Sequence, residues 1–314
     1  MHSESFTRPE MNRRTFLSRT ALVAAGGLLA AKRAWAGETS AARPAGDVAG
    51  QRYKIAVCDW MILKRQKLGA FQLTKEIGAD GVEVDMGSLG QAETFANELA
   101  KPEVRQQFLD TARALGLGIS SLAMSGFYAQ SFAKRPTVQR MVQDCIDTAK
   151  AMGVKVAFLP LGVESDLVAH RDLRPAVVER LKAIAPRAEA AGVVIGIETS
   201  LDAAAEARLL DEIGSPAIRS YFNFSNALQN NRDLHAELRT LGRARICQIH
   251  CTDQDGVWLQ NDPKIDLPQV KRTLDDMGWS GWLVIERSRD ATKSRDVKYN
   301  FGANAAYLKK VFQT

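Results

Sequence analysis

The sequence has few cysteines and few histidines. Each residue type occurs four times among 314 residues, and no two cysteines form a C-x-x-C pair. A C-x-x-C pair is typical of structural zinc sites and of redox motifs. Its absence argues against both classes of protein. We expect free thiols in the core at Cys58, Cys145, Cys247 and Cys251.

Glycine-rich phosphate-binding turns are also missing. Neither G-x-G-x-x-G nor G-x-x-x-x-G-K-[ST] occurs, although an open, doubly wound sheet would be expected to carry such a turn early. Single glycines recur instead, with the first intervals being 38, 37 and 39 residues. Helices commonly end on a glycine in the left-handed conformation. Each interval therefore predicts one helix–turn–strand unit. The helices of these units are expected to end at Gly78, Gly116, Gly153, Gly192, Gly214, Gly242 and Gly278.

Short apolar stretches alternate with amphipathic ones along the chain. Residues 136–152 show the clearest helical spacing, with apolar side chains at i, i+3, i+4 and i+7. Strands are expected at 54–60, 82–85, 119–124, 154–161, 193–198, 218–224, 245–250 and 282–286. Helices are expected at 71–77, 102–115, 136–152, 174–191, 203–213, 232–241, 267–277 and 300–312. This alternation predicts an α/β protein with a parallel sheet, closed as a single-domain (β/α)8 TIM barrel over residues 52–314.

The N-terminal apolar run is too short to cross a bilayer comfortably. It covers Thr20–Ala31, follows Asn12-Arg13-Arg14-Thr15-Phe16-Leu17, and precedes Ala34-Trp35-Ala36. This order is typical of a twin-arginine (Tat) signal peptide with its cleavage site, although a chance arginine pair before an apolar helix would look the same. We predict a signal peptide at 1–36, a flexible linker at 37–51, and a periplasmic or exported protein without a stable membrane anchor after cleavage.

The net positive charge is small once this segment is set aside. The full chain carries +6, and residues 1–36 hold six Lys or Arg and two Asp or Glu. The predicted mature chain therefore carries only +2. A basic face is the usual mark of nucleic-acid binding, so we expect no nucleic-acid partner.

Three predicted strands end on a residue that can bind a metal or move a proton. These residues are Glu198, His250 and Glu286. The carboxyl ends of barrel strands form the active-site face, so the three side chains are expected to converge there. Taken singly, Glu198 or Glu286 would be interpreted as a surface carboxylate, and a lone histidine such as His250 as a structural one.

Several loop residues are more ambiguous. Long loops at 125–135 and 254–265 carry aromatic side chains that suit either sugar faces or ordinary packing. The basic run Lys64–Lys67 is interpreted as a solvated loop rather than a phosphate site.

Five motifs occur in order along the chain: Gly78–Glu83, Gly196–Glu198, Phe222–Ala227, Gln248–His250 with Asp253, and Gly281–Arg287. Together they resemble the xylose-isomerase-like TIM-barrel family of sugar phosphate isomerases and epimerases. The resemblance covers about residues 53–312. No single motif is specific, but five on successive strands indicate the family, although they say nothing of the substrate.

This resemblance implies a metal centre and a carbohydrate substrate. In that family, strands five to eight supply Glu, Asp, His and Glu to one divalent cation (Mn, Co, Mg or Zn). The matching positions are Glu198, Asn223, His250 and Glu286, so that Asn223 replaces the Asp, and Thr252 replaces a frequent lysine. Glu198 and Glu286 would then be the catalytic proton carriers. Expected substrate-binding residues are Glu83, Asn226, Asp253, Arg287, Trp60 and Trp258.

The sequence thus predicts an exported sugar isomerase or epimerase that moves a proton next to a carbonyl with the help of a divalent metal. A metal-dependent lyase or dehydratase acting on keto-sugars or inososes is an alternative. A catalytically silent carbohydrate-binding barrel is another, favoured by Asn223 and Thr252. An abasic-site endonuclease would need more histidines and a basic DNA-facing surface. A homo-oligomer is left open.

Overall fold

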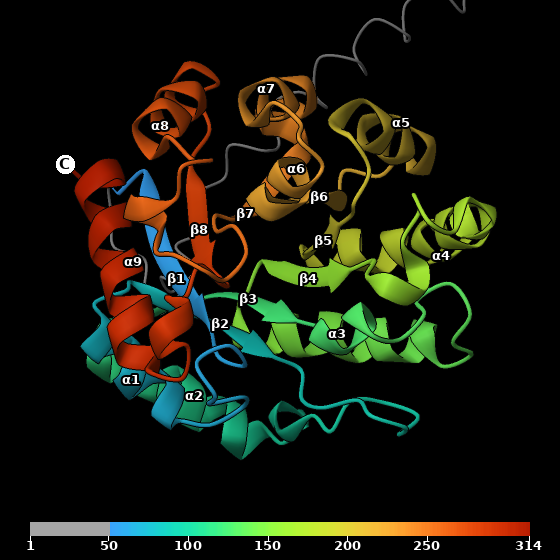
Figure 1. Ribbon diagram of the computed structural model, residues 1–314. Coiled ribbons are helices and arrows are strands. Elements are labelled where there is room, and N and C mark those ends of the chain that lie inside the picture. Colours follow the sequence, from blue (N-terminus) through green and yellow to red (C-terminus); the bar gives the residue numbers. More distant parts are fainter. Residues whose placement is uncertain (1–50) are drawn as a thin grey trace, which may run out of the picture. The chain divides into compact units, whose positions relative to one another are not determined.

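A computed structural model describes residues 51–314, in which eight parallel strands close into a barrel in the order β1 to β8. Figure 1 shows these strands at the centre with the helices around them. The predicted (β/α)8 barrel is confirmed. The predicted signal peptide and almost all of the linker lie outside the described residues. None of the helices within 51–314 is long and apolar enough to cross a bilayer.

The strands are β1 (Tyr53–Cys58), β2 (Gly81–Asp85), β3 (Gly118–Ala123), β4 (Val156–Pro160), β5 (Val194–Glu198), β6 (Ile218–Asn223), β7 (Ile246–His250) and β8 (Gly281–Ile285). The α-helices are α1 (Gly69–Ile77), α2 (Pro102–Leu115), α3 (Val138–Met152), α4 (Arg174–Ala191), α5 (Ala203–Ile213), α6 (Phe224–Gln229), α7 (Leu234–Arg245), α8 (Leu267–Asp276) and α9 (Val297–Phe312). Within the described part of the chain, six short 3-10 helices lie in the loops: η1 (Glu98–Ala100), η2 (Ser125–Tyr128), η3 (Val163–Ser165), η4 (Arg171–Leu173), η5 (Leu259–Asn261) and η6 (Ala291–Lys293).

The main core lies between the barrel and its helices. α3 shows how it forms, because Met141, Val142 and Cys145 lie on the apolar stripe of the helix and are buried. Burial of a large apolar side chain contributes roughly 1.5–3 kcal/mol, so this layer supplies much of the stability. All four cysteines are free thiols, as predicted.

Five helices of residues 51–314 end on a glycine in the left-handed conformation, as the spacing predicts: Gly78 (φ 86°), Gly116, Gly153, Gly192 (φ 66°) and Gly214. Gly278 also has a positive φ and follows the last residues of α8, whereas Gly242 lies inside α7, which it interrupts with a φ of 70° and a ψ of 162°. An L side chain is strained in this region, whereas glycine is not. The repeated turn therefore returns the chain to the next strand after each of these five helices.

One predicted boundary is wrong in a way that affects the site. Phe224 was expected in a strand, but it begins α6, because the Asn223 side chain accepts a hydrogen bond from Ser225 N at 2.9 Å and caps this helix. Glu286 lies one residue beyond β8. Both differences occur at the carboxyl face of the barrel.

Candidate active site

Four strand ends bring the predicted metal ligands together. Glu198, Asn223 and His250 are the last residues of β5, β6 and β7, and Glu286 directly follows β8. His250 Nδ1 lies 2.8 Å from Glu198 Oε2 and 4.0 Å from Glu286 Oε2. Asn223 Nδ2 donates to Glu198 Oε2 at 3.0 Å and to Glu286 Oε2 at 3.4 Å. The four side chains therefore meet at one point.

Asn223 presents its nitrogen to this point. Its Oδ1 accepts from Ser225 N, a group that can only donate, so the direction of the amide is fixed. The nitrogen that faces Glu198 and Glu286 carries two hydrogens and is a hydrogen-bond donor rather than a ligand. For its oxygen to reach a cation, the amide would have to turn and release the α6 cap, which contributes about 1 kcal/mol.

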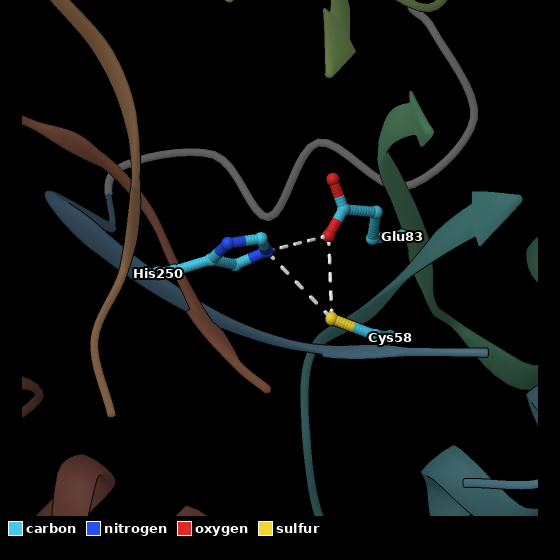
Figure 2. Close-up of side chains that lie close together, drawn as sticks. All are labelled: Cys58, Glu83 and His250. Carbon is cyan, nitrogen blue, oxygen red and sulfur yellow. Dashed lines mark hydrogen bonds and ion pairs between the residues drawn. The ribbon is translucent and has the colours of Figure 1, made fainter. Parts of the chain in front are cut away.

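A second group of side chains lies on the other side of the His250 ring. His250 Nε2 is 3.0 Å from Glu83 Oε2 and 3.8 Å from Cys58 Sγ, and the Cys58 thiol lies 3.3 Å from Glu83 Oε2 (Figure 2). All three side chains are fully buried. Their ligand atoms lie within 4.8 Å of one another, so this Cys58–Glu83–His250 group could hold a metal ion.

Glu83 is the centre of a buried hydrogen-bond network. Its Oε1 accepts from Ser121 Oγ and from Tyr221 OH, each at 2.9 Å. Gln248 Nε2 donates to the same two hydroxyl oxygens, each at 2.8 Å. Gly196 leaves space for Tyr221, because a Cβ at Gly196 would lie 3.0 Å from the tyrosine ring. The network joins β2, β3, β6 and β7 across the barrel interior.

Sequence reasoning missed Cys58, Ser121 and Tyr221 as site residues. Nothing in the sequence around these three residues distinguishes them from ordinary strand residues, so the sequence offered only a weak indication of their role. Cys58 is nevertheless the last residue of β1 and lies in register with Glu83 on β2. A polar residue at the end of one strand, in register with a carboxylate on the neighbouring strand, is the feature that marks it.

Burial and like charges perturb the ionisable groups of the site. Burial alone lowers the pKa of His250, but the Glu83 charge and the Glu198 contact outweigh it, so this pKa lies well above its ordinary value. Burial raises the pKa of Glu286, and the Glu198 charge adds to this effect while His250 opposes it. Burial and the Glu83 charge raise the pKa of the Cys58 thiol well above its usual range. The site therefore concentrates negative charge that a cation or a proton would relieve.

A cavity of about 320 Å³ opens beside Glu198 and Glu286. This volume is at the lower end of the range of about 300–1,000 Å³ for small-molecule sites. Trp60 stacks on Phe158 at a centroid distance of 6.3 Å, and both line the cavity. The remaining lining residues are Met61, Arg65, Ser125, Gly126, Tyr128, Ala129, Pro160 and Arg287. Carboxylates thus share the cavity with aromatic side chains.

Two predicted substrate-binding residues, Trp60 and Arg287, line this cavity. Arg65 lines it as well, and its Nη1 lies 2.9 Å from the fully buried Asp85 Oδ1. The interpretation of the Lys64–Lys67 run as a solvated loop is therefore wrong for Arg65. Its guanidinium is fixed at the wall of the cavity.

Of the other four predicted substrate-binding residues, Glu83 is fully buried and is not among those lining the cavity, and the remaining three hold loops in place. Asn226 Nδ2 donates to Thr199 O at 2.9 Å, and Trp258 Nε1 donates to Asn300 Oδ1 at 2.9 Å. Asp253 accepts from Gln229 Nε2 at 2.5 Å. None of these three predicted residues is among those lining the cavity. Their contact with a substrate stays a prediction.

This barrel and its strand-end residues define the class of protein. The chain belongs to the xylose isomerase-like TIM barrel family, whose sequence profile matches residues 71–311. No sequence among the curated proteins matches the chain.

Solved structures with the same fold include two sugar epimerases. The D-allulose 3-epimerase from Methylomonas sp., in complex with D-allulose, is 14% identical with a TM-score of 0.61, and the match covers 83% of this chain and 98% of that one. The 3-keto-D-glucoside 4-epimerase from E. coli is 15% identical with a TM-score of 0.61, and the match covers 83% and 99%. A xylose isomerase domain protein from Planctomyces limnophilus is 16% identical with a TM-score of 0.64, covering 84% and 100%. At these identities the likeness shows the fold alone.

Proposed function

We propose that this protein is a sugar isomerase or epimerase that moves a proton next to a carbonyl group. One observation carries the proposal: Glu198 and Glu286 both line a cavity of about 320 Å³ and both approach His250 Nδ1. Two carboxylates at one cavity are a suitable pair for removing a proton and returning it. The epimerase activity of proteins with the same fold supports the reaction class.

The donor set suits a divalent cation. Two carboxylates and one imidazole nitrogen face one point, and the gathered negative charge there favours a cation. Glu198, His250 and Glu286 would hold it, with Asn223 donating to both carboxylates. A bound divalent cation would act as a Lewis acid that polarises a carbonyl oxygen of the substrate.

The two carboxylates then divide the proton transfers. One of Glu198 and Glu286 accepts the proton from the carbon next to the carbonyl; the electron pair of the broken C–H bond forms a C=C bond, and the π pair of the carbonyl moves to its oxygen. The other carboxyl group, in its acid form, returns a proton. Return to the same carbon from the opposite face gives an epimer. Return to the former carbonyl carbon, with the proton of the neighbouring hydroxyl group passing to the former carbonyl oxygen, gives the aldose–ketose isomer. Trp60 offers an apolar face to the C–H groups of a sugar.

Two other functions remain alternatives. Expulsion of a β-hydroxyl group from the same intermediate would make the protein a lyase or dehydratase on a keto-sugar or inosose. A catalytically silent carbohydrate-binding barrel is favoured by the direction of the Asn223 amide, because hydrogen bonds from Asn223 Nδ2 already satisfy Glu198 and Glu286.

Export by the twin-arginine route is part of the proposal and rests on the N-terminal sequence alone. An exported enzyme would meet free sugars, keto-sugars or glycosides more often than phosphorylated metabolites. We therefore propose an unphosphorylated carbohydrate as the substrate.

A screen of free sugars, 3-keto-sugars and inososes, supplemented with Mn²⁺, Co²⁺, Mg²⁺ or Zn²⁺ in deuterated water, tests the reaction class. Deuterium at the carbon next to the carbonyl, together with a new epimer or isomer in the NMR spectrum, supports the proposal. Loss of water from the substrate identifies the lyase. Carbohydrate binding without exchange in any metal identifies the silent barrel.

A further inference from the structure

We propose that Glu83 is a positioning residue that keeps the proton of His250 on Nε2 and so leaves the Nδ1 lone pair facing Glu198 and Glu286. We call the Cys58–Glu83–His250 group the lock, because its hydrogen bonds fix the position of the proton on the His250 ring. Cys58 and Glu83 are then not metal ligands. This inference deepens the proposed function and rests on its metal site.

The position of the proton follows from the burial of the two carboxylates. A neutral imidazole has one N–H donor and one lone pair, and each ring nitrogen of His250 faces a carboxylate oxygen. Glu83 is fully buried, so its charge needs hydrogen-bond donors from the protein. Glu198 borders the cavity, where water or a cation can reach it. A proton on Nδ1 would leave the Nε2 lone pair facing the buried charge at 3.0 Å, which is the costlier arrangement.

The network around Glu83 reinforces this arrangement. Glu83 Oε1 accepts from Ser121 and Tyr221, and Cys58 donates to Oε2. The fourth donor available to Glu83 is His250 Nε2–H. An ionised carboxylate has about four acceptor positions, so all of them are used.

The same observations argue against a metal ion within the lock. Only three candidate ligands meet there, among the histidine, cysteine and carboxylate side chains of residues 51–314, whereas a buried structural zinc site has four. None of the three side chains is exposed to solvent that could supply a fourth ligand.

A carboxylate that orients a metal-binding histidine typically changes metal affinity 10- to 100-fold. Glu83→Leu removes the acceptor while filling most of the space, and we expect it to weaken Zn²⁺ binding by about this factor. Glu83→Gln retains an acceptor oxygen for Nε2–H, so its affinity should stay within about threefold of wild type. The matched control is Cys58→Ala, which removes a possible ligand and leaves the Glu83–His250 contact. Because a thiol is only a weak hydrogen-bond donor to Glu83, this variant should weaken Zn²⁺ binding far less than Glu83→Leu does.

Calorimetric titration with Zn²⁺ and ¹H–¹⁵N NMR of the histidine rings form the test. The tautomer is read in metal-free protein at alkaline pH, where the ring is neutral, and again with Zn²⁺ bound. His170 and His235, outside the site, supply reference signals. We expect His250 to carry its proton on Nε2 in both states, and a mixture of tautomers in metal-free Glu83→Leu.

The possible outcomes separate this inference from the function on which it rests. A proton on Nδ1, or a large loss of Zn²⁺ affinity in Cys58→Ala, overturns the lock and assigns the metal to the Cys58–Glu83–His250 group. Equal affinities of wild type and Glu83→Leu overturn the positioning role. Failure of wild type to bind any divalent ion removes the metal from the proposed function, while the tautomer of the metal-free protein still decides the role of Glu83.

Discussion

The amide nitrogen of Asn223, and not its oxygen, lies 3.0 Å from Glu198 Oε2. The oxygen is held by Ser225 N at the start of α6. The residue that the sequence resemblance predicted as a metal ligand therefore donates hydrogen bonds to two carboxylates. An asparagine in place of the expected aspartate also carries one negative charge fewer at the candidate metal site.

We predict that Asn223→Asp tightens divalent-metal binding by about tenfold or more, where each tenfold change in affinity corresponds to about 1.4 kcal/mol. One carboxylate oxygen of the new residue can still accept from Ser225 N, while the other replaces the N–H donor and faces the cation. Without metal, the added charge beside Glu198 and Glu286 should lower the melting temperature. Titration calorimetry and thermal unfolding of metal-stripped proteins check both effects. Unchanged affinity would mean that residue 223 does not touch the metal.

Glu198→Gln and Glu286→Gln should each lower kcat at least about 100-fold, since each removes a proton carrier. Folding should be nearly unaffected because both side chains lie at the carboxyl face of the barrel, where residues serve function more than stability. The control is Glu164→Gln, an exposed residue on η3 outside the cavity. Steady-state kinetics with thermal unfolding provide the measurement, and near-normal kcat in either variant would exclude that residue from the proton transfer.

Glu206 on α5 gives a pH-dependent contribution to stability. It is buried, and burial raises its pKa to about 8 from an ordinary value of 4.5. Between these values the folded protein keeps a proton that the unfolded chain has released, so stability falls as pH rises through this window and levels off above about 8. The fall is on the order of a few kcal/mol.

Glu206→Gln should remove this part of the pH dependence, because its amide does not titrate. Urea unfolding of wild type and variant between pH 5 and pH 9 isolates the effect, since every other group is shared. We expect the stability of the variant relative to wild type to increase with pH. Parallel curves would show that Glu206 does not titrate in this range.

The twin-arginine prediction concerns residues outside the described part of the chain. Replacement of Arg13 and Arg14 together by Lys should block export, and the secreted wild-type protein should begin at residue 37. Cell fractionation and N-terminal sequencing check the two statements. A double variant that still reaches the periplasm would contradict the Tat assignment.

The fold was predictable because its signals are local. The glycines at 78 and 192 end helices within their own units, and strand and helix periods lie within short windows. The convergence of Glu198, His250 and Glu286 followed from their strand ends and from the geometry of a parallel barrel.

The features of the site that the sequence did not predict depend on contacts between segments that are far apart in the chain. The amide direction of Asn223 is set by where α6 begins, and the sequence placed Phe224 in a strand instead. The ring of Trp258 lies against Tyr299 of α9 at a centroid distance of 4.6 Å. Cys58 meets His250 across 192 positions of sequence. No local pattern carries such information.

Because Gly196 has no side chain, the residues that fit at positions 196, 221 and 247 depend on one another. A Cβ there would lie 2.8 Å from Cys247 Sγ and 3.0 Å from the Tyr221 ring, so this small residue and its two neighbours share one volume. Tyr221 in turn donates to Glu83. A lineage that enlarged residue 196 would have to shrink residue 221 or 247 at about the same time. Substitutions at these three sites should therefore covary. Each site should also change more slowly in evolution than a site whose side chain can vary independently.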